Sequence, residues 1–199
     1  GGFLISIAME RWGLHKRIAL STMLYAGTKP SLQILAMMLV TAFLSMWMSN
    51  TATAVMMLPI ALSITHLVKQ SDPSNEGFGK ALLLSIAYGA SIGGIATLIG
   101  TPPNALMAAY LSDSYQIEIG FAQWMLVGVP LAVSMLFISW IWLTKFAYKV
   151  DVGIKNNQKI DTKAVFTEQL KALGEMQRAE KGVLFVFVLA AACWIFRPL

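Results

Sequence analysis

The stretch "FLSMWMSNTATAVMMLP", Phe43 to Pro59, interrupts a long apolar run with polar residues. It places three consecutive polar side chains, Ser49-Asn50-Thr51, near the middle of a run, 30–68, that contains no Asp, Glu, Lys or Arg. In the whole chain of 199 residues, 57% are hydrophobic and 13% are charged, whereas soluble domains have about 25% charged residues. The composition therefore predicts an integral membrane protein, and its long apolar runs predict an all-α one.

The distribution of basic residues predicts the orientation of the charge-free runs, which are 30–68, 81–112, 119–144 and 182–196. Lys and Arg number 4, 2, 0 and 8 in the stretches that precede these runs or lie between them, 9–29, 69–80, 113–118 and 145–181. Because basic loops stay on the cytoplasmic side, we expect only the loop 113–118 to lie outside. The net charge of +5 belongs to these flanks and does not indicate a nucleic-acid partner.

The run 30–68 has to turn back on itself. Both of its flanks are predicted to be cytoplasmic, and its 39 residues would form a straight helix of roughly 58 Å, about twice the thickness of the hydrocarbon core. It is either two full spans joined by an outer loop or a re-entrant hairpin whose tip stops inside the membrane. Irregular backbone at membrane depth is tolerated only where protein buries it or where it lines a watery cavity. The re-entrant alternative would therefore make Ser49-Asn50-Thr51 a site.

The run 81–112 contains "GASIGGIATLIGTPPNAL", which predicts a broken helix. Pro102 and Pro103 have no N–H, so the carbonyls of Leu98 and Ile99 lose their helical donors, and we expect a break near Thr101. Thr101 can cap a second half-helix that has proline in its first turn. Upstream, small residues form a surface that another helix can approach closely, above all Gly89, Gly93 and Gly94.

The predicted organisation follows from these runs. It comprises the end of a transmembrane helix plus an interfacial arm helix at 1–29, a re-entrant hairpin at 30–68, a cytoplasmic loop at 69–80, a broken transmembrane helix at 81–112, an external loop at 113–118, a transmembrane helix at 119–144, a cytoplasmic or interfacial amphipathic helix at 145–181, and the start of a further transmembrane helix at 182–199. The incomplete apolar runs at both ends favour an internal piece of a longer protein. Cys193, in an apolar run, is expected to be buried.

Two polar interruptions in neighbouring membrane segments are typical of a secondary-transporter site. Either one alone is more often a helix cap or a kink, and only the pair favours a site. Ser45 lies one turn before Ser49, and we expect both hydroxyls on one helical face to reach an ion together with the Asn50 amide oxygen. Neutral oxygens without carboxylates favour a monovalent cation such as Na⁺ over Ca²⁺ or Mg²⁺. No Lys or Arg is available there for an anion, which would depend on hydroxyls, amides, helix dipoles and the bound cation.

The chain carries none of the common enzymatic motifs. There is no His-Glu-x-x-His zinc motif, no Gly-x-Ser-x-Gly elbow and no phosphate-binding glycine loop. We therefore assign no catalytic residue and expect a protein that is not an enzyme.

The motifs "SNTATAVMMLP", preceded by "TAFLSMWM", and "GGIATLIGTPPN" resemble the N-terminal half of the divalent anion/sodium symporter family, the INDY-type bacterial dicarboxylate and citrate transporters. "MERWGLHKRIAL" is similar to their bacterial members as well. The resemblance implies a multi-pass protein of the cell inner membrane that carries out sodium-coupled symport of di- or tricarboxylate anions such as succinate or citrate. It further implies two inverted repeats, of which this chain is one, a homodimer and an elevator-type mechanism.

The same resemblance implies residue roles. It assigns Ser45, Ser49, Asn50 and Gly100 to sodium, and Asn50, Thr51 and Thr101 to a substrate carboxylate, with Thr101 where the family often has Ser. Sodium is then a co-transported ion and no prosthetic group is implied. The implied partners are the carboxylate anion, sodium, the lipid bilayer, a second copy of the chain and a C-terminal half with a second Ser-Asn-Thr tip, without which this half is not expected to transport.

Other functions remain open at this stage. The anion could be a succinate-like dicarboxylate, citrate or sulfate. A related arsenite or proton antiporter and a non-transporting membrane scaffold subunit are the alternative functions. Dicarboxylate uptake that does not depend on sodium would favour the antiporter over a symporter. The absence of a second Ser-Asn-Thr tip from the C-terminal half would favour the scaffold subunit.

Overall fold

A computed structural model of the chain describes residues 2–27, 29–71, 76–148, 150 and 162–196. Within these ranges the secondary structure is helical and contains no strand. The helices are α1 (Gly2–Arg11), α2 (Leu14–Ala26), α3 (Pro30–Ser45), α4 (Asn50–Ser71), α5 (Glu76–Ile95), α6 (Pro102–Tyr115), α7 (Phe121–Ile141), the π-helical turn η1 (Trp142–Ala147), α8 (Thr162–Ala172) and α9 (Arg178–Ile195). The predicted all-helical class is confirmed over the described residues.

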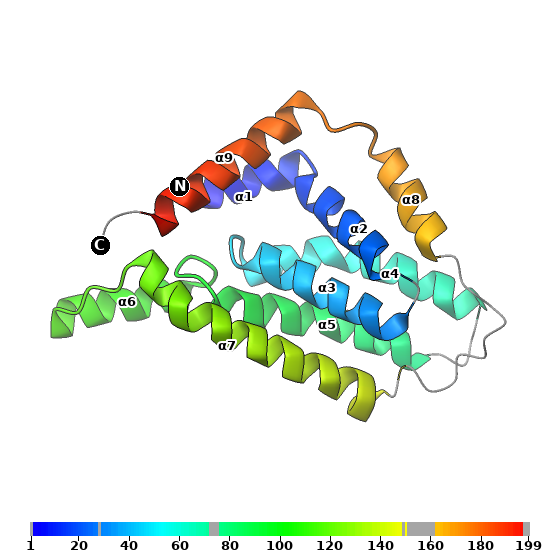
Figure 1. Ribbon diagram of the computed structural model, residues 1–199, viewed down its shortest axis with the longest axis horizontal. Coiled ribbons are helices and arrows are strands. Elements are labelled where there is room, and N and C mark those ends of the chain that lie inside the picture. Colours follow the sequence, from blue (N-terminus) through cyan, green and yellow to red (C-terminus); the bar gives the residue numbers. More distant parts are fainter. Residues whose placement is uncertain (1, 28, 72–75, 149, 151–161, 197–199) are drawn as a thin grey trace.

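The run 30–68 folds into a helical hairpin. α3 and α4 run in opposite directions and are joined by the short turn 46–49 (Figure 1). Pro30 occupies the first turn of α3, where proline is well tolerated because no intrahelical N–H is needed. The chain thus turns back at the polar tripeptide, as the length of the run requires.

α5 packs against the hairpin through glycines. A Cβ atom added to Gly89 would lie 2.7 Å from the carbonyl oxygen of Met38, and one added to Gly93 would overlap the backbone of Ala42. These contacts are with the backbone of α3, which cannot move aside as a flexible side chain can. The close approach predicted from the small residues is therefore confirmed, and it brings the end of α5 to the hairpin tip.

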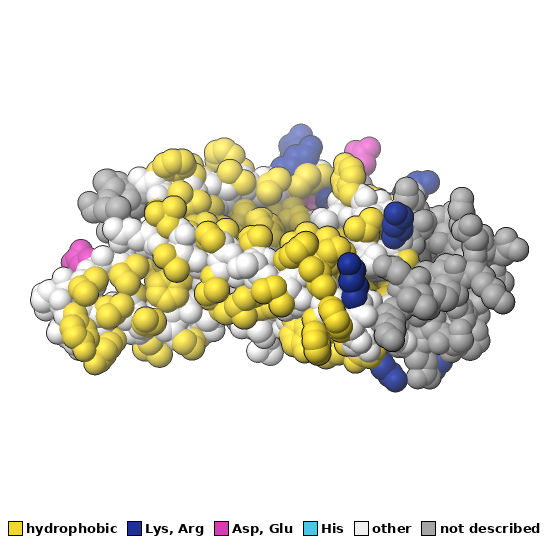
Figure 2. Space-filling view, turned by 60° about the horizontal axis from the view of Figure 1, so that its bottom comes forward, with side chains coloured by type: hydrophobic (Ala, Val, Ile, Leu, Met, Phe, Trp, Pro, Cys, Tyr) yellow, Lys and Arg dark blue, Asp and Glu magenta, His cyan; other side chains and the backbone are white. Residues whose placement is uncertain are grey.

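α7 packs on the end of α5 and exposes its other side. A Cβ added to Gly128 would lie 2.9 Å from the carbonyl oxygen of Ile95. Large apolar side chains are exposed on α7, including Leu126, Val127, Val133, Phe137 and Ile138, and Figure 2 shows hydrophobic side chains over much of the visible surface. Such a surface suits a lipid environment. Of the described helical segments, Gly77–Ile95 and Phe121–Ala147 are long and apolar enough to cross a membrane.

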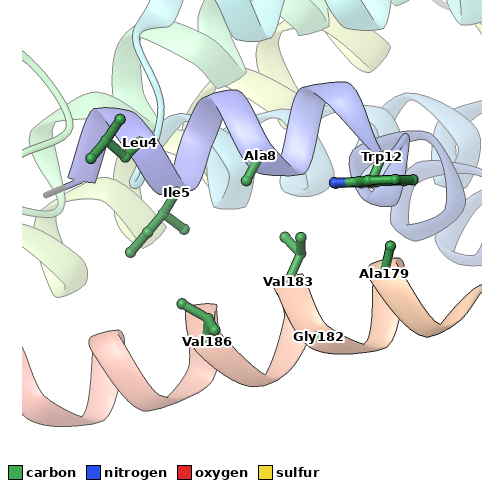
Figure 3. A pocket seen from close by; sticks show the side chains of 8 residues that line it. All are labelled: Leu4, Ile5, Ala8, Trp12, Ala179, Gly182, Val183 and Val186. Carbon is green, nitrogen blue, oxygen red and sulfur yellow. The ribbon is translucent and has the colours of Figure 1, made fainter.

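α1, α2, α8 and α9 lie on one side of this bundle, whereas α6 extends from the end of α5 (Figure 1). α1 and α9 lie side by side, and α2 and α8 lie together near the other end of the bundle (Figure 1). Arg17 on α2 forms an ion pair with Glu180 on α9 at 3.2 Å and donates to the carbonyl of Gly174 at 3.1 Å. An apolar pocket of about 400 Å³ lies between α1 and α9, and Figure 3 shows side chains that line it, among them Leu4 and Val186.

Several helices extend beyond the charge-free runs. α4 continues to Ser71 and α6 to Tyr115, so the loops predicted at 69–80 and 113–118 are shorter than expected. α9 begins at Arg178 instead of 182, and Glu180 in its first turn accepts a hydrogen bond from the Gln177 N–H at 3.2 Å. The physical reason is that long charged side chains can remain helical while their heads reach water.

The segment 145–181 is not one helix over its described residues. It contains the end of η1, then α8, a turn and the start of α9, while residues 149 and 151–161 lie outside the described part. Cys193 is exposed, so the expectation of a buried thiol is wrong: an apolar run can present part of its surface to lipid or to other chains as well as to the interior.

Candidate functional site

The hairpin tip holds a cluster of oxygens that share one hydrogen. Ser45, the last residue of α3, is fully buried. Its Oγ lies 2.7 Å from Oδ1 of Asn50, the first residue of α4, and 2.7 Å from the carbonyl oxygen of Ala90 in α5. A serine hydroxyl has one hydrogen and can donate to only one of these two acceptors at a time. The arrangement has spare lone pairs, which a cation can use.

Two of the residues predicted to hold sodium converge on Gly94. A Cβ on Gly94 would overlap the Asn50 amide, and a Cβ on Gly100 would lie 2.5 Å from the Gly94 carbonyl oxygen. The tip and the helix break therefore meet over a residue that has no side chain. The sequence predicts a helix-packing role for Gly94, and in the structure it also supplies the space for the Asn50 amide.

Ser49 does not share a helical face with Ser45. α3 ends at Ser45, and Ser49 lies in the following turn, where it is exposed. Its Oγ accepts a hydrogen bond from the N–H of Ala52 at 3.3 Å, as an N-cap of α4 does. The expected geometry is wrong because the helix stops before the tripeptide, and the assignment of Ser49 to sodium stays a prediction.

Four helix ends meet around this cluster. α3 and α5 end here, while α4 and α6 begin here, at the same end of the bundle (Figure 1). The Thr97 hydroxyl donates to the Met46 carbonyl and ties the break to the hairpin turn. Helix C-termini carry partial negative charge and N-termini partial positive charge. The ends of α3 and α5 are therefore suited to a cation, and the beginnings of α4 and α6 are suited to an anion.

The residues predicted to bind substrate lie at the two helix N-termini. Thr51 is exposed in the first turn of α4, and Thr101 is the half-buried N-cap of α6. Thr101 has the extended backbone of an N-cap, but its side chain makes no capping hydrogen bond. No side-chain hydrogen bond joins either threonine to the oxygen cluster within the described ranges, so their role in anion binding stays a prediction.

The break is stabilised by two side chains to which sequence reasoning gave no role. Asn104 Nδ2 donates to the carbonyls of Gly94 and Thr97, both at 2.8 Å, and Trp124 Nε1 donates to the Ile95 carbonyl at 2.9 Å. The carbonyls of Gly94, Ile95 and Thr97 thereby receive side-chain donors. The available signal was an asparagine directly after the Pro-Pro pair, because its amide offers two hydrogens to nearby carbonyls.

The sequence matches the family described as "Citrate transporter" over residues 1–199. The chain belongs to the citrate transporter family. It is 41% identical over 204 residues to the sodium-dependent dicarboxylate transporter SdcS of Staphylococcus saprophyticus subsp. saprophyticus, and 38% identical over 203 residues to the protein of the same name from Staphylococcus aureus strain USA300. Each alignment covers 99% of this chain and 38% of the relative, so the chain spans about 38% of the length of these relatives.

Membership in the citrate transporter family makes this a membrane protein of a transporter family rather than an enzyme. It confirms the resemblance to the dicarboxylate and citrate transporters that the two motifs indicated.

The oxygen cluster of this citrate transporter family member contains no titratable side chain. Its described members are a hydroxyl, an amide and a main-chain carbonyl. Across the part of the chain that the structure describes, no group of three or more His, Cys, Asp or Glu side chains could hold a metal ion. Divalent cations usually recruit carboxylates, so the chemistry of the cluster fits a monovalent cation.

Proposed function

We propose that this chain is the first repeat of a sodium-coupled symporter for di- or tricarboxylate anions such as succinate or citrate. The observation that carries the proposal is the cluster at the hairpin tip, where the oxygens of Ser45, Asn50 and Ala90 share a single hydroxyl hydrogen. The names of the relatives, which are sodium-dependent dicarboxylate transporters, support the choice of ion and anion.

Sodium would bind between the hairpin tip and the helix break. Ser45 and Asn50 supply side-chain oxygens, with Gly100 and Ser49 as the further ligands that the family resemblance implies. The C-terminal ends of α3 and α5 lie nearby and favour positive charge. The fully buried position of Ser45 strengthens this attraction, because electrostatic interactions are less screened away from water.

The carboxylate of the anion would bind at the N-termini of α4 and α6. The Asn50 amide and the hydroxyls of Thr51 and Thr101 are its proposed donors. None of these groups is charged, so the attraction between the anion and the nearby sodium supplies much of the binding energy. Each ion lowers the electrostatic cost of binding the other, which is a physical basis for symport.

The proposed whole protein contains more than this chain. A second repeat with its own Ser-Asn-Thr tip would complete the anion site, and the hairpin would be re-entrant within a multi-pass protein of the cell inner membrane. The non-helical turn 46–49 and the break 96–101 are the kind of interruption found at transporter midplanes. The family resemblance further favours a homodimer that works by an elevator-type movement.

The test is uptake by the full-length protein in liposomes. We expect an inward sodium gradient to drive uptake of labelled succinate, whereas a potassium gradient should not. Asn50→Ala and Thr51→Ala should each abolish most of this uptake while the protein still inserts and folds. Ser134→Ala is a matched control, because Ser134 is exposed on α7 and bonds within its own helix at 2.7 Å.

Two results would count against the proposal. Uptake that is the same in sodium and potassium would refute sodium coupling. Normal sodium-driven uptake by Asn50→Ala and Thr51→Ala would refute the site. Competition by unlabelled citrate or sulfate identifies the preferred anion in the same assay.

A further inference from the structure

Thr53 has a buried hydroxyl without a partner. It lies in the first turn of α4 and is 0% exposed, and its Oγ1 makes no hydrogen bond with any described residue. A helical threonine usually bonds to the carbonyl four residues earlier. Here that carbonyl, of Ser49, accepts the Thr53 N–H at 3.0 Å, and the hydroxyl makes no bond to it. Buried hydroxyls are rarely left unpaired, so the Thr53 hydroxyl is available to a bound ligand if one lies close by.

The position of Thr53 places it next to the oxygen cluster. Residues three apart lie on the same face of a helix, so the buried Thr53 lies about one turn after the half-buried Asn50 on the same face of α4. Helical side chains lean toward the N-terminus, which directs Thr53 toward the turn that holds Asn50. The Asn50 Oδ1 in turn lies 2.7 Å from Ser45 Oγ.

We propose that the Thr53 hydroxyl is a further oxygen ligand of the cation at Ser45 and Asn50, bound directly or through one ordered water. The inference rests on the proposed function and deepens the same site. The Thr53 hydroxyl would add to the oxygens already proposed for sodium, which come from Ser45, Asn50, Ser49 and Gly100, and it has two lone pairs to offer. Its hydrogen would turn away from the cation.

Thr65 provides a matched control in the same helix. Its Oγ1 is also buried without a partner, but it lies twelve residues further along α4, about 18 Å away at the rise of an α-helix. It faces Gly79 of α5, where a Cβ would lie 3.5 Å from the Thr65 hydroxyl. An unpaired hydroxyl at Thr65 therefore belongs to helix packing, at the other end of α4 from the oxygen cluster.

The experiment compares Thr53→Val with Thr65→Val in the full-length protein. The readouts are the sodium concentration that gives half-maximal succinate uptake and the rise in melting temperature on replacing potassium by sodium at constant ionic strength. We expect Thr53→Val to raise the half-maximal sodium concentration by roughly tenfold or more, as loss of a group that supports a metal site does. Thr65→Val should leave it unchanged.

The outcomes separate the inference from the proposed function. If uptake by the unmodified protein does not depend on sodium, the proposed function fails. If it does depend on sodium and Thr53→Val has the same sodium dependence, only the role of Thr53 is overturned. If Thr53→Val does not fold, the test uses Thr53→Ser and Thr53→Ala, which are similar in size and differ in the hydroxyl. We expect Thr53→Ser to retain the sodium affinity and Thr53→Ala to lose it. Equal sodium affinities of the two variants would overturn the inference.

Discussion

The hairpin turn 46–49 and the helix break 96–101 interrupt neighbouring apolar helices at the same end of the bundle, yet their polar groups are satisfied in opposite ways (Figure 1). At the break, Asn104 and Trp124 donate to main-chain carbonyls of the last turn of α5 and the residues after it. At the tip, the acceptors around Ser45 outnumber its one hydrogen. The donors at the break come from the protein itself, whereas the oxygens at the tip keep lone pairs that suit a cation.

The difference implies that the helix break positions the hairpin tip, whereas the tip itself would bind the ion. The break fixes where the hairpin tip lies, through Thr97 and the glycines of α5. The tip supplies the oxygens. Changes at the break should therefore affect stability first, and changes at the tip should affect sodium binding first.

The largest expected effect is that of Gly93→Ala, which brings a Cβ into the backbone of Ala42. Because neither backbone can yield, we expect a loss of about 3 kcal/mol of stability, at the upper end for overpacking. The measurement is the yield and melting temperature of the full-length protein. Gly182→Ala on α9 is the control, since its Cβ would meet open space and alanine favours a helix by about 1 kcal/mol. Equal yields and melting temperatures of the Gly93→Ala and Gly182→Ala variants would refute close packing at Gly93.

Asn104→Ala is expected to have the next largest effect. It removes both hydrogen bonds to the Gly94 and Thr97 carbonyls and leaves buried acceptors unpaired, at a cost of about 2 kcal/mol. The melting temperature should fall, while the protein that remains folded should still respond to sodium. If Asn104→Ala has a normal melting temperature that sodium no longer raises, Asn104 belongs to the binding site. The break would then take part in binding as well as the tip.

Trp124→Phe should have the smallest effect. The change keeps an aromatic ring and removes only the hydrogen bond from Nε1 to the Ile95 carbonyl, which is worth about 1 kcal/mol. We expect a slightly lower melting temperature and an unchanged half-maximal sodium concentration. A large change in sodium affinity would mean that the Ile95 carbonyl also serves the ion.

The parts of the fold that depend on local chemistry could be predicted from the sequence. The length of the run 30–68 required a turn, and Pro102 and Pro103 prevent an uninterrupted helix. The glycines of α5 indicated a close helix contact, which the backbone of Ala42 confirms at Gly93. Each of these follows from a rule about one segment or one residue type.

The parts that depend on tertiary contacts could not be predicted. Nothing local shows that α3 stops at Ser45, so Ser49 was placed on the wrong face. The partners of Asn104 and Trp124 lie 7 to 29 residues away along the chain, and a linear reading does not pair them. The sharing of one hydrogen between Asn50 and Ala90 likewise needs α5 beside the hairpin.

The most direct test of the central claim is the rise in melting temperature that sodium gives the purified full-length protein, with potassium as the reference. A ligand that binds only the folded state raises its stability in proportion to RT ln(1 + [L]/Kd). We predict this rise for the unmodified protein and for Trp124→Phe, and its loss in Ser45→Ala, which removes the hydroxyl at the centre of the oxygen cluster. An undiminished rise in Ser45→Ala would show that sodium does not bind at the hairpin tip.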